Sequence, residues 1–307
     1  MIGGENEGLS DAPRPELARV FMALVLLPLL VSSMVYLGES VEVSARYTVD
    51  LSAVECNAPP PGPAAAIAAR DLVRMPLGEL ERSLFDPDLG FAVRQVFEAS
   101  PWVREVVSVK RVFRGLEIEL DYRMPYAAIE REGAYLFADS EGNILPVTSP
   151  RPVLPGPVIT VTGVEGEPTS DAPIDGLWFA DAVREGVAVL RELHARADHP
   201  VFQEVGIRAI DVANFRQRVD RAASEVLLVT NRNWSDEARG IVGRPVYVRW
   251  ERSGSTSSVE AQLEVGRKLD NLLAAHRLRP GFDRVGMIDI RWEDPIYRTI
   301  DALVVRR

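Results

Sequence analysis

Few side chains in this sequence are of a type suited to acid–base or metal chemistry. The histidines are His194, His199 and His276, and the first two stand five positions apart. A zinc site on a helix needs two histidines four positions apart together with a glutamate base, and no HExxH motif is present. The dipole of a helix favours histidines near its C-terminal end, so we interpret these residues as solvated surface groups. We expect no metal and no cofactor.

Acidic residues form one dense group. Glu117, Glu119 and Asp121 alternate with aliphatic residues, and this period of two places the carboxylates on the solvent face of a single strand. No GxSxG motif, P-loop or Cys–His pair is present. A glycosidase pair among scattered acids stays open, because it depends on spatial separation alone. The sequence therefore favours a protein that is not an enzyme, with a membrane-anchored envelope enzyme as a lower-ranked alternative.

The overall composition is that of globular material. The chain has 307 residues, of which 47% are hydrophobic and 26% charged, so it has room for about two domains. Its net charge of −10 argues against nucleic acid, whose binders present a basic face. Cys56 is the single cysteine, so no internal disulfide can form, and we interpret it as a loop thiol.

One stretch is apolar throughout. It runs from Val20 to Leu37, reads VFMALVLLPLLVSSMVYL and contains no charged residue. A helix of this length reaches about 30 Å, the thickness of the hydrocarbon core of a bilayer. Lipid offers no partner for backbone polar groups, so the segment should be helical, with a kink at Pro28. We expect a transmembrane helix over residues 20–38.

Two other interpretations of this stretch are weaker. A cleaved signal peptide needs a small-x-small site, and Val31–Ser33 is a poor one. A buried core helix would be apolar on one stripe only. Arg14 and Arg19 precede the stretch, while Arg46 alone follows it closely, which favours a cytoplasmic N-terminus. We expect a single-pass protein of the cytoplasmic (inner) membrane, with residues 1–19 inside and the bulk outside.

The segment after the anchor, residues 39–74, divides into two parts. Val41–Leu51 alternates apolar and polar residues, as a half-buried strand does. The sequence AVECNAPPPGPAAAIAAR that follows predicts a semi-rigid spacer, because its prolines prevent regular structure. Whether Val41–Leu51 joins the sheet of the next domain is open.

Residues 75–150 show the patterns of a compact α+β domain. Leucines at helical spacing predict a helix, a second amphipathic helix ends at a proline, and strands with a period of two follow. The expected elements are helices Pro76–Leu84 and Leu89–Ala99, then strands Trp102–Phe113, Leu116–Asp121, Tyr126–Glu130 and Ala134–Ala138. We expect the ring of Trp102 to be buried between the second helix and the sheet.

Residues 151–307 predict a second α+β domain. It begins with an amphipathic helix, which several strands follow. A long loop is expected at Asn231–Gly243 and contains Trp234. A capping box at Ser257-x-x-Glu260 predicts the start of a second helix. The expected helix is Leu177–Arg196, and the strands are Ile207–Val212, Glu225–Thr230, Pro245–Trp250, Val285–Trp292 and Ile296–Val305.

Several short motifs follow one another in a fixed order. A Pro-Trp-Val sequence precedes an Arg-bearing strand, and an Arg-x-Pro-x-Ala motif, an Asp-x-x-Gly turn and a Leu-Pro sequence leading to Thr-Gly come after it. The residues are Pro101, Trp102, Val103, Arg111, Arg123, Pro125, Ala127, Asp139, Gly142, Leu154, Pro155, Thr162 and Gly163. Behind a single anchor, this region resembles the FtsQ/DivIB family of bacterial division proteins. Farther on, Lys268 and the Ile-Asp-x-Arg strand at Ile288–Arg291 are similar to that family as well.

This resemblance implies a fold and a function. The fold would be a POTRA domain over residues 75–150, with Pro101, Trp102, Arg123, Pro125, Asp139 and Gly142 as structural residues, and an FtsQ-type domain over residues 151–307. The protein would be a division scaffold that recruits FtsB/FtsL-type single-pass proteins. A POTRA-containing envelope assembly or secretion factor is the alternative, although such factors need tandem modules or a barrel, and the sequence shows neither pattern.

The resemblance also places the partner site on the last strands of the sheet. Partners would add a strand to an open edge there. Ile288 and Ile290 share a face by their period of two and should be core. Trp292 and Tyr297 are the expected contacts, because aromatic residues carry much interface energy, and Arg291 and Met287 complete the candidate site. In the opposing interpretation, the two rings simply close the edge of the core.

Overall fold

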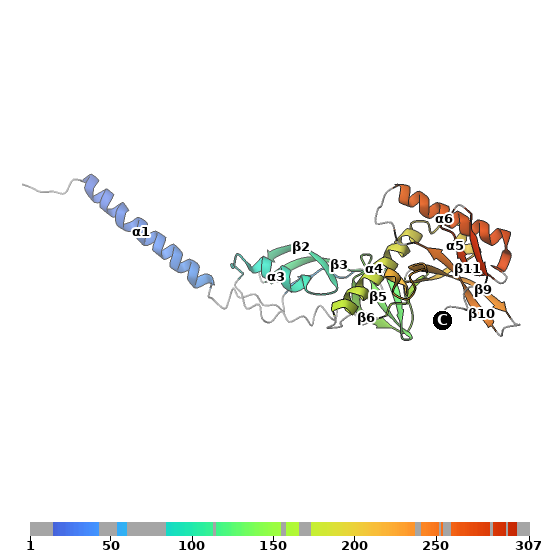
Figure 1. Ribbon diagram of the computed structural model, residues 1–307. Coiled ribbons are helices and arrows are strands. Elements are labelled where there is room, and N and C mark those ends of the chain that lie inside the picture. The colour runs from blue at the N-terminus through green and yellow to red at the C-terminus, as the bar shows by residue number, and fades with distance from the viewer. Residues whose placement is uncertain are drawn as a thin grey trace, which may run out of the picture. The chain divides into compact units, whose positions relative to one another are not determined.

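A computed structural model gives the fold of this chain (Figure 1). It describes residues 15–42, 54–59, 84–112, 115–154, 158–165, 173–236, 241–251, 253, 259–282, 285–292 and 294–299. The chain divides into two compact units and is mixed α+β. The first unit takes in Met1–Asn57, Pro76–Phe97 and Val106–Glu119, and the second takes in Ala58–Met75, Glu98–Glu105 and Leu120–Arg307.

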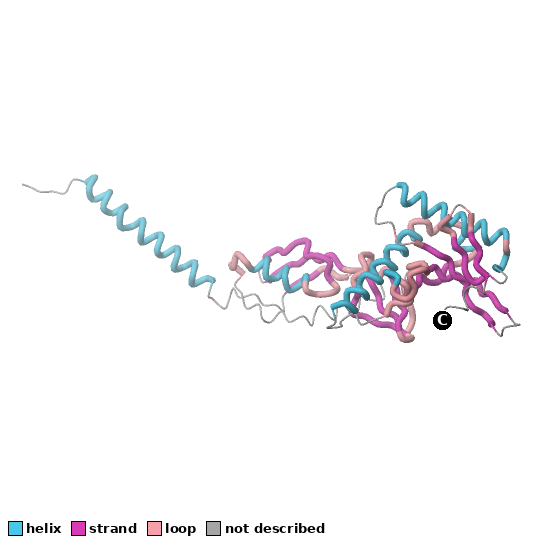
Figure 2. Tube along the Cα trace, in the orientation of Figure 1, coloured by secondary structure: helices cyan, strands magenta, loops and turns pink. Residues whose placement is uncertain are grey.

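Helix α1, Pro15–Glu42, contains the apolar stretch (Figure 2). Its large apolar side chains from Val20 to Leu37 are all exposed, and Pro28 lies inside the helix. Within the described residues this helix is long and apolar enough to cross a membrane, as the sequence predicts, and a signal sequence near an N-terminus has the same properties. The helix exceeds the expected bounds at both ends, and the strand predicted at Val41–Leu51 is wrong at its first two residues, which are helical.

The remainder of that predicted strand lies outside the described residues, and the strand that does join the sheet is β1, Val54–Cys56. The sequence analysis assigned this segment to the proline-rich spacer. β1 pairs in parallel with β3, so Val54 stands opposite Leu116. Hydrogen bonds to a distant strand stabilise it, and a segment this short shows no pattern of its own.

The first unit contains a three-stranded sheet in the order β1-β3-β2. Its other members are β2, Val103–Val112, and β3, Gly115–Tyr122, both of which continue into the second unit. Helix α3, Leu89–Glu98, buries one stripe at Leu89, Val93 and Phe97. The expected alternation on β3 is confirmed, because Leu116, Ile118 and Leu120 are buried and Glu117 and Glu119 are exposed. The helix predicted at Pro76–Leu84 lies, except for its last residue, outside the described part of the chain.

The second unit is built on a nine-stranded sheet in the order β12-β11-β10-β9-β8-β7-β4-β5-β6. The strands are β4 Ala127–Arg131, β5 Ala134–Ala138, β6 Ile144–Ser149, β7 Thr160–Thr162, β8 Ile207–Asp211, β9 Val226–Asp236, β10 Ile241–Trp250, β11 Val285–Asp289 and β12 Ile296–Thr299. β4, β5 and β6 therefore belong to this larger sheet and not, as the sequence analysis assigned them, to the domain of residues 75–150. The physical reason is the parallel pairing of β4 with β7, a long-range contact that a strand pattern does not encode.

Helices α4, Pro173–His194, and α6, Val259–Leu278, pack with the core of this sheet, and the short helix α5, Val201–Glu204, contacts α6. Phe179, Val183, Val187 and Leu190 recur at helical spacing along α4, and all four are buried, as an amphipathic helix requires. Gly186 permits close packing, since a Cβ atom there would lie 2.6 Å from Cγ1 of Val161 on β7. The described part of the unit also contains the short 3₁₀ helices Phe215–Gln217 and Pro280–Phe282.

The loop expected at Asn231–Gly243 is wrong, because most of it extends the β9–β10 hairpin. Trp234 pairs with Arg244, and its side chain is buried. The polar sequence of this stretch is typical of a loop, yet strand pairing and burial of the indole stabilise an extended conformation. Ser257 of the predicted capping box lies outside the described residues, and so does the predicted strand beyond Thr299.

Trp102 is buried, with 2% of its surface exposed, but its neighbours differ from the expected ones. The ring packs with Ala128, Phe137 and Leu145 on β4, β5 and β6. The expected burial against a sheet is confirmed, but this sheet is the larger one, which contains β4 and β5. Trp102 precedes β2, and this base of the strand belongs to the second unit.

Candidate functional site

The last two strands of the large sheet carry the residues singled out as a partner site. β11 pairs with β12 in antiparallel fashion, so Ile288 stands opposite Tyr297 and Asp289 opposite Ile296. Ile288 and Ile290 are fully buried, as expected. β12 is the terminal strand of the sheet, and no described strand pairs with its outer edge. Its backbone N–H and C=O groups on that side can pair with an added strand.

Trp292 follows β11 and has an exposed side chain. Its relative exposure is 59%, and Ile296 at the start of β12 is 47% exposed. The backbone at Trp292 is nevertheless bonded, because Nδ2 of Asn271 on α6 donates to its carbonyl oxygen at 2.8 Å. A large aromatic ring on a bonded backbone beside an open strand edge has the features of an interface anchor.

Tyr297 lies on the core side of β12. Its ring packs against the main core, its hydroxyl donates to the carbonyl oxygen of Ala275 at 3.5 Å, and the guanidinium of Arg279 lies 4.6 Å from the ring centroid. This half-buried ring closes the edge of the core. For Tyr297 the structure therefore favours a role in the core over a role as a partner contact.

Arg291 is bonded inside the chain. Its Nε and Nη2 donate to the two carboxylate oxygens of Asp289 at 2.8 and 2.7 Å, and Glu251 lies 3.9 Å from Nη1. The hydrogen bond to Asp289 raises the pKa of Arg291. Burial alone would raise the pKa of Asp289, but hydrogen bonds and charge from Arg291, together with Arg249, lower it. The Arg291 side chain therefore has its main partners within the chain.

Met287 is buried at 8% exposure, and Nε of Arg249 lies 3.1 Å from its sulfur atom. Both faces of β11 are thus buried, and the Met287 side chain is not exposed. The structure brings the four candidates together at one sheet edge, and Trp292 is the one whose side chain is mostly exposed.

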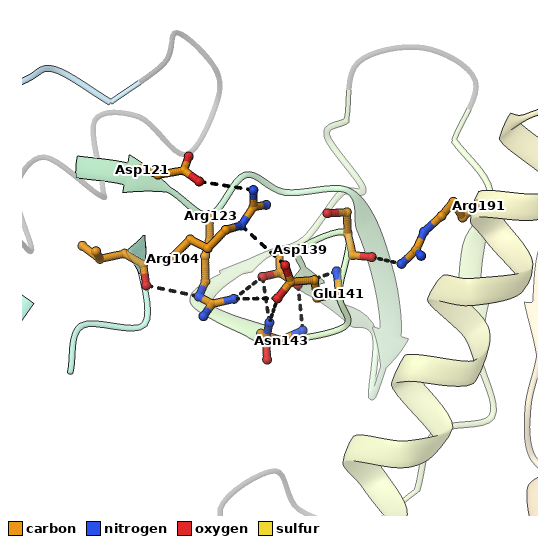
Figure 3. Close-up of polar contacts among 9 residues, drawn as sticks. Arg104, Asp121, Arg123, Asp139, Glu141, Asn143 and Arg191 are labelled. Carbon is orange, nitrogen blue, oxygen red and sulfur yellow. Dashed lines mark hydrogen bonds and ion pairs between the residues drawn. The ribbon is translucent and has the colours of Figure 1, made fainter. Parts of the chain in front are cut away.

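A polar network surrounds Asp139, in the turn between β5 and β6 (Figure 3). Its side chain is 1% exposed and accepts hydrogen bonds from Nη1 of Arg123 at 2.7 Å, from the backbone N–H groups of Glu141 and Asn143, and from Nδ2 of Asn143. Burial by itself would raise the pKa of Asp139, but these hydrogen bonds lower it below its usual value.

The same network joins several segments of the second unit. Nε of Arg123 donates to the carbonyl oxygen of Val103, and Arg104 lies within 3.3 Å of Asp121 and 3.6 Å of Glu141. The Asp139 network therefore connects Val103, Arg104 and Asp121 with the β5–β6 turn.

Gly142 and Arg191 attach that turn to α4. Gly142 has a φ of +86°, and a Cβ atom there would lie 2.7 Å from Cγ of Arg184. Nη2 of Arg191 donates to the carbonyl oxygen of Ser140. Pro125 lies half-buried between β3 and β4, and Pro101 is exposed after α3. Gly142 is therefore a position where a side chain would not fit.

The histidines His194, His199 and His276 are each partly buried, so their interpretation as solvated surface groups is wrong. Nδ1 of His194 lies 3.1 Å from the hydroxyl of Tyr126, and burial lowers the pKa of this histidine. Nε2 of His199 lies 3.1 Å from Asp270. Among the described residues, no group of three or more His, Cys, Asp or Glu side chains could hold a metal ion.

The sequence analysis missed several residues that shape the edge. Asn271 and Arg267 on α6 bond the backbone beyond β11, and Arg249 is a buried charge with an acidic partner. The four-residue spacing of Arg267 and Asn271 predicts that the two side chains share one face of a helix. It does not predict which backbone groups that face contacts.

Comparisons with known proteins leave the family open. No protein-family model matches this chain, and no curated protein matches it at a significant level. The features above are therefore the basis of any functional conclusion.

Proposed function

We propose that this protein is a single-pass membrane scaffold of bacterial cell division, of the FtsQ/DivIB type. The observation that carries the proposal is the open edge of β12 beside the exposed ring of Trp292. α1 would anchor the protein in the cytoplasmic membrane with its N-terminus inside, and the parts of both units that follow α1 would lie outside the cytoplasm.

The first unit supports this proposal. A strand, a helix and two further strands, in the sheet order β1-β3-β2, follow the plan of a POTRA domain as far as the described residues extend. In the second unit, the motif residues Arg123 and Asp139 form an ion pair, and the backbone N–H of Gly142 donates to the carbonyl oxygen of Asp139, which gives a physical reason for their occurrence together. The second unit would be the FtsQ-type domain.

The proposed mechanism is recruitment by strand addition. An extended segment of an FtsB/FtsL-type single-pass protein would pair with the outer edge of β12 through backbone hydrogen bonds. Its side chains would cover Trp292 and Ile296, which flank the turn between β11 and β12. Backbone pairing would supply affinity, and contact with the indole would supply specificity.

The test is co-isolation of the full chain with its partners. The tagged protein is isolated from detergent-solubilised membranes, and FtsB-type and FtsL-type proteins are quantified by mass spectrometry. We expect both to be enriched and Trp292→Ala to lower their recovery about 30-fold, which corresponds to about 2 kcal/mol. Val219→Ala, at an exposed position of the same unit, is the matched control and should leave recovery unchanged. Recovery of neither partner with the unaltered chain would refute the proposal.

A further inference from the structure

Two side chains of α6 bond the backbone that carries Trp292. Nη2 of Arg267 donates to the carbonyl oxygen of Arg291 at 3.3 Å, and Nδ2 of Asn271 donates to that of Trp292 at 2.8 Å. Nδ2 of Asn271 also lies 3.5 Å from the carbonyl oxygen of Ile290. Arg267 and Asn271 are four positions apart, so they project from one face of the helix.

These carbonyl groups come after Asp289, the last residue of β11, where regular strand pairing ends. A second restraint acts from inside the segment, because Oδ1 of Asp289 accepts the backbone N–H of Arg291 at 3.3 Å and its carboxylate also binds the Arg291 guanidinium. The backbone from Ile290 to Trp292 is thus held by side chains rather than by the sheet.

The Trp292 ring, in contrast, has little packing to hold it, since most of its surface is exposed. Exposing an indole forgoes the stabilisation that burial would give. A ring presented on a restrained backbone also loses less conformational freedom when a partner binds.

We propose that Asn271 is a positioning residue for the partner site: its amide fixes the Trp292 carbonyl and thereby sets the direction in which the indole meets the partner. This inference rests on the proposed function. Asn271 acts through Trp292 and touches no partner itself.

The experiment is a double-mutant cycle on the full chain in detergent. The probe is the extracytoplasmic segment of the FtsB-type protein encoded in the same genome, immobilised on a sensor surface. Affinities are compared for the unaltered chain, Asn271→Ala, Trp292→Ala and the double variant. Gln262→Ala, at an exposed position of the same helix, is the control.

We expect Asn271→Ala to weaken binding about fivefold when Trp292 is present, as loss of one hydrogen bond predicts, and to have no effect in the Trp292→Ala background. Amide hydrogen exchange at Trp292 and Asp294 should become faster in Asn271→Ala and stay unchanged in Gln262→Ala. A merely structural asparagine would lower binding equally in both backgrounds, because it would act on the whole fold.

The outcomes separate the two proposals. If Trp292→Ala weakens binding but Asn271→Ala does not, or if the two effects add, the positioning role is wrong and the proposed function stands. If Trp292→Ala leaves binding unchanged, the contact surface lies elsewhere and both the site and the positioning role are wrong.

Discussion

Arg123 and Asp139 form an ion pair of 2.7 Å in which the carboxylate is almost completely buried. Arg123 follows β3 directly, and Asp139 begins the turn between β5 and β6. Within the second unit, one carboxylate thus binds the residue that follows β3 and satisfies two backbone N–H groups of its own turn. The stability of the second unit should depend on this pair.

We expect Asp139→Ala to lower the free energy of unfolding by about 3 kcal/mol, because it leaves buried donors without an acceptor. Glu141→Ala is the matched control, because its carboxylate also contacts Arg123 but is largely exposed, and it should cost less than about 1 kcal/mol. Urea unfolding of the two variants measures both values. Equal costs would contradict a special role of the buried carboxylate.

The pH dependence of stability should show the same pair. Hydrogen bonding lowers the pKa of Asp139 in the folded chain, so its contribution to stability is complete above the unfolded pKa of about 4 and is lost as the pH falls through the folded value. The difference in Tm between the unaltered chain and Asp139→Asn should therefore be constant from pH 7 to about pH 5 and shrink below about pH 4. A difference that grows on acidification would contradict this sign.

Truncation of Trp102 and of Trp292 to alanine should change the free energy of unfolding by very different amounts. Trp102→Ala removes a buried ring from its contacts with Phe137 and Leu145 and should cost about 3–5 kcal/mol. Trp292→Ala removes an exposed ring and should change the free energy of unfolding by less than about 1 kcal/mol. Thermal unfolding of both variants tests this, and a large loss in Trp292→Ala would make its ring a structural one.

The anchor should keep the N-terminus in the cytoplasm and remain uncleaved. Arg19 precedes the apolar stretch, and positive charge is retained on the cytoplasmic side. A reporter fused after Arg307 that is active only outside the cytoplasm should be active, and the membrane-bound product should have full length on a gel. Processing to a shorter, soluble product would identify the stretch as a signal sequence.

The sequence by itself determined the features that depend on local periodicity. The apolar stretch gives α1, the stripe through Phe179 and Leu190 gives α4, and the alternation around Ile118 gives β3. In each case the burial pattern repeats within one element, so neighbours in the chain carry the information.

Only the tertiary structure decided which elements belong together. β1 exists because of β3, β4–β6 belong to the second sheet because β4 pairs with β7, and Asn231–Asp236 is extended because it pairs with β10. At the candidate site, the Asp289 carboxylate binds Arg291, Met287 is buried and Asn271 bonds the Trp292 carbonyl. Packing decides which strands and side chains meet in these contacts. The alternation of apolar and polar residues in a strand is the same whichever strand pairs with it, so the sequence pattern does not identify the neighbour.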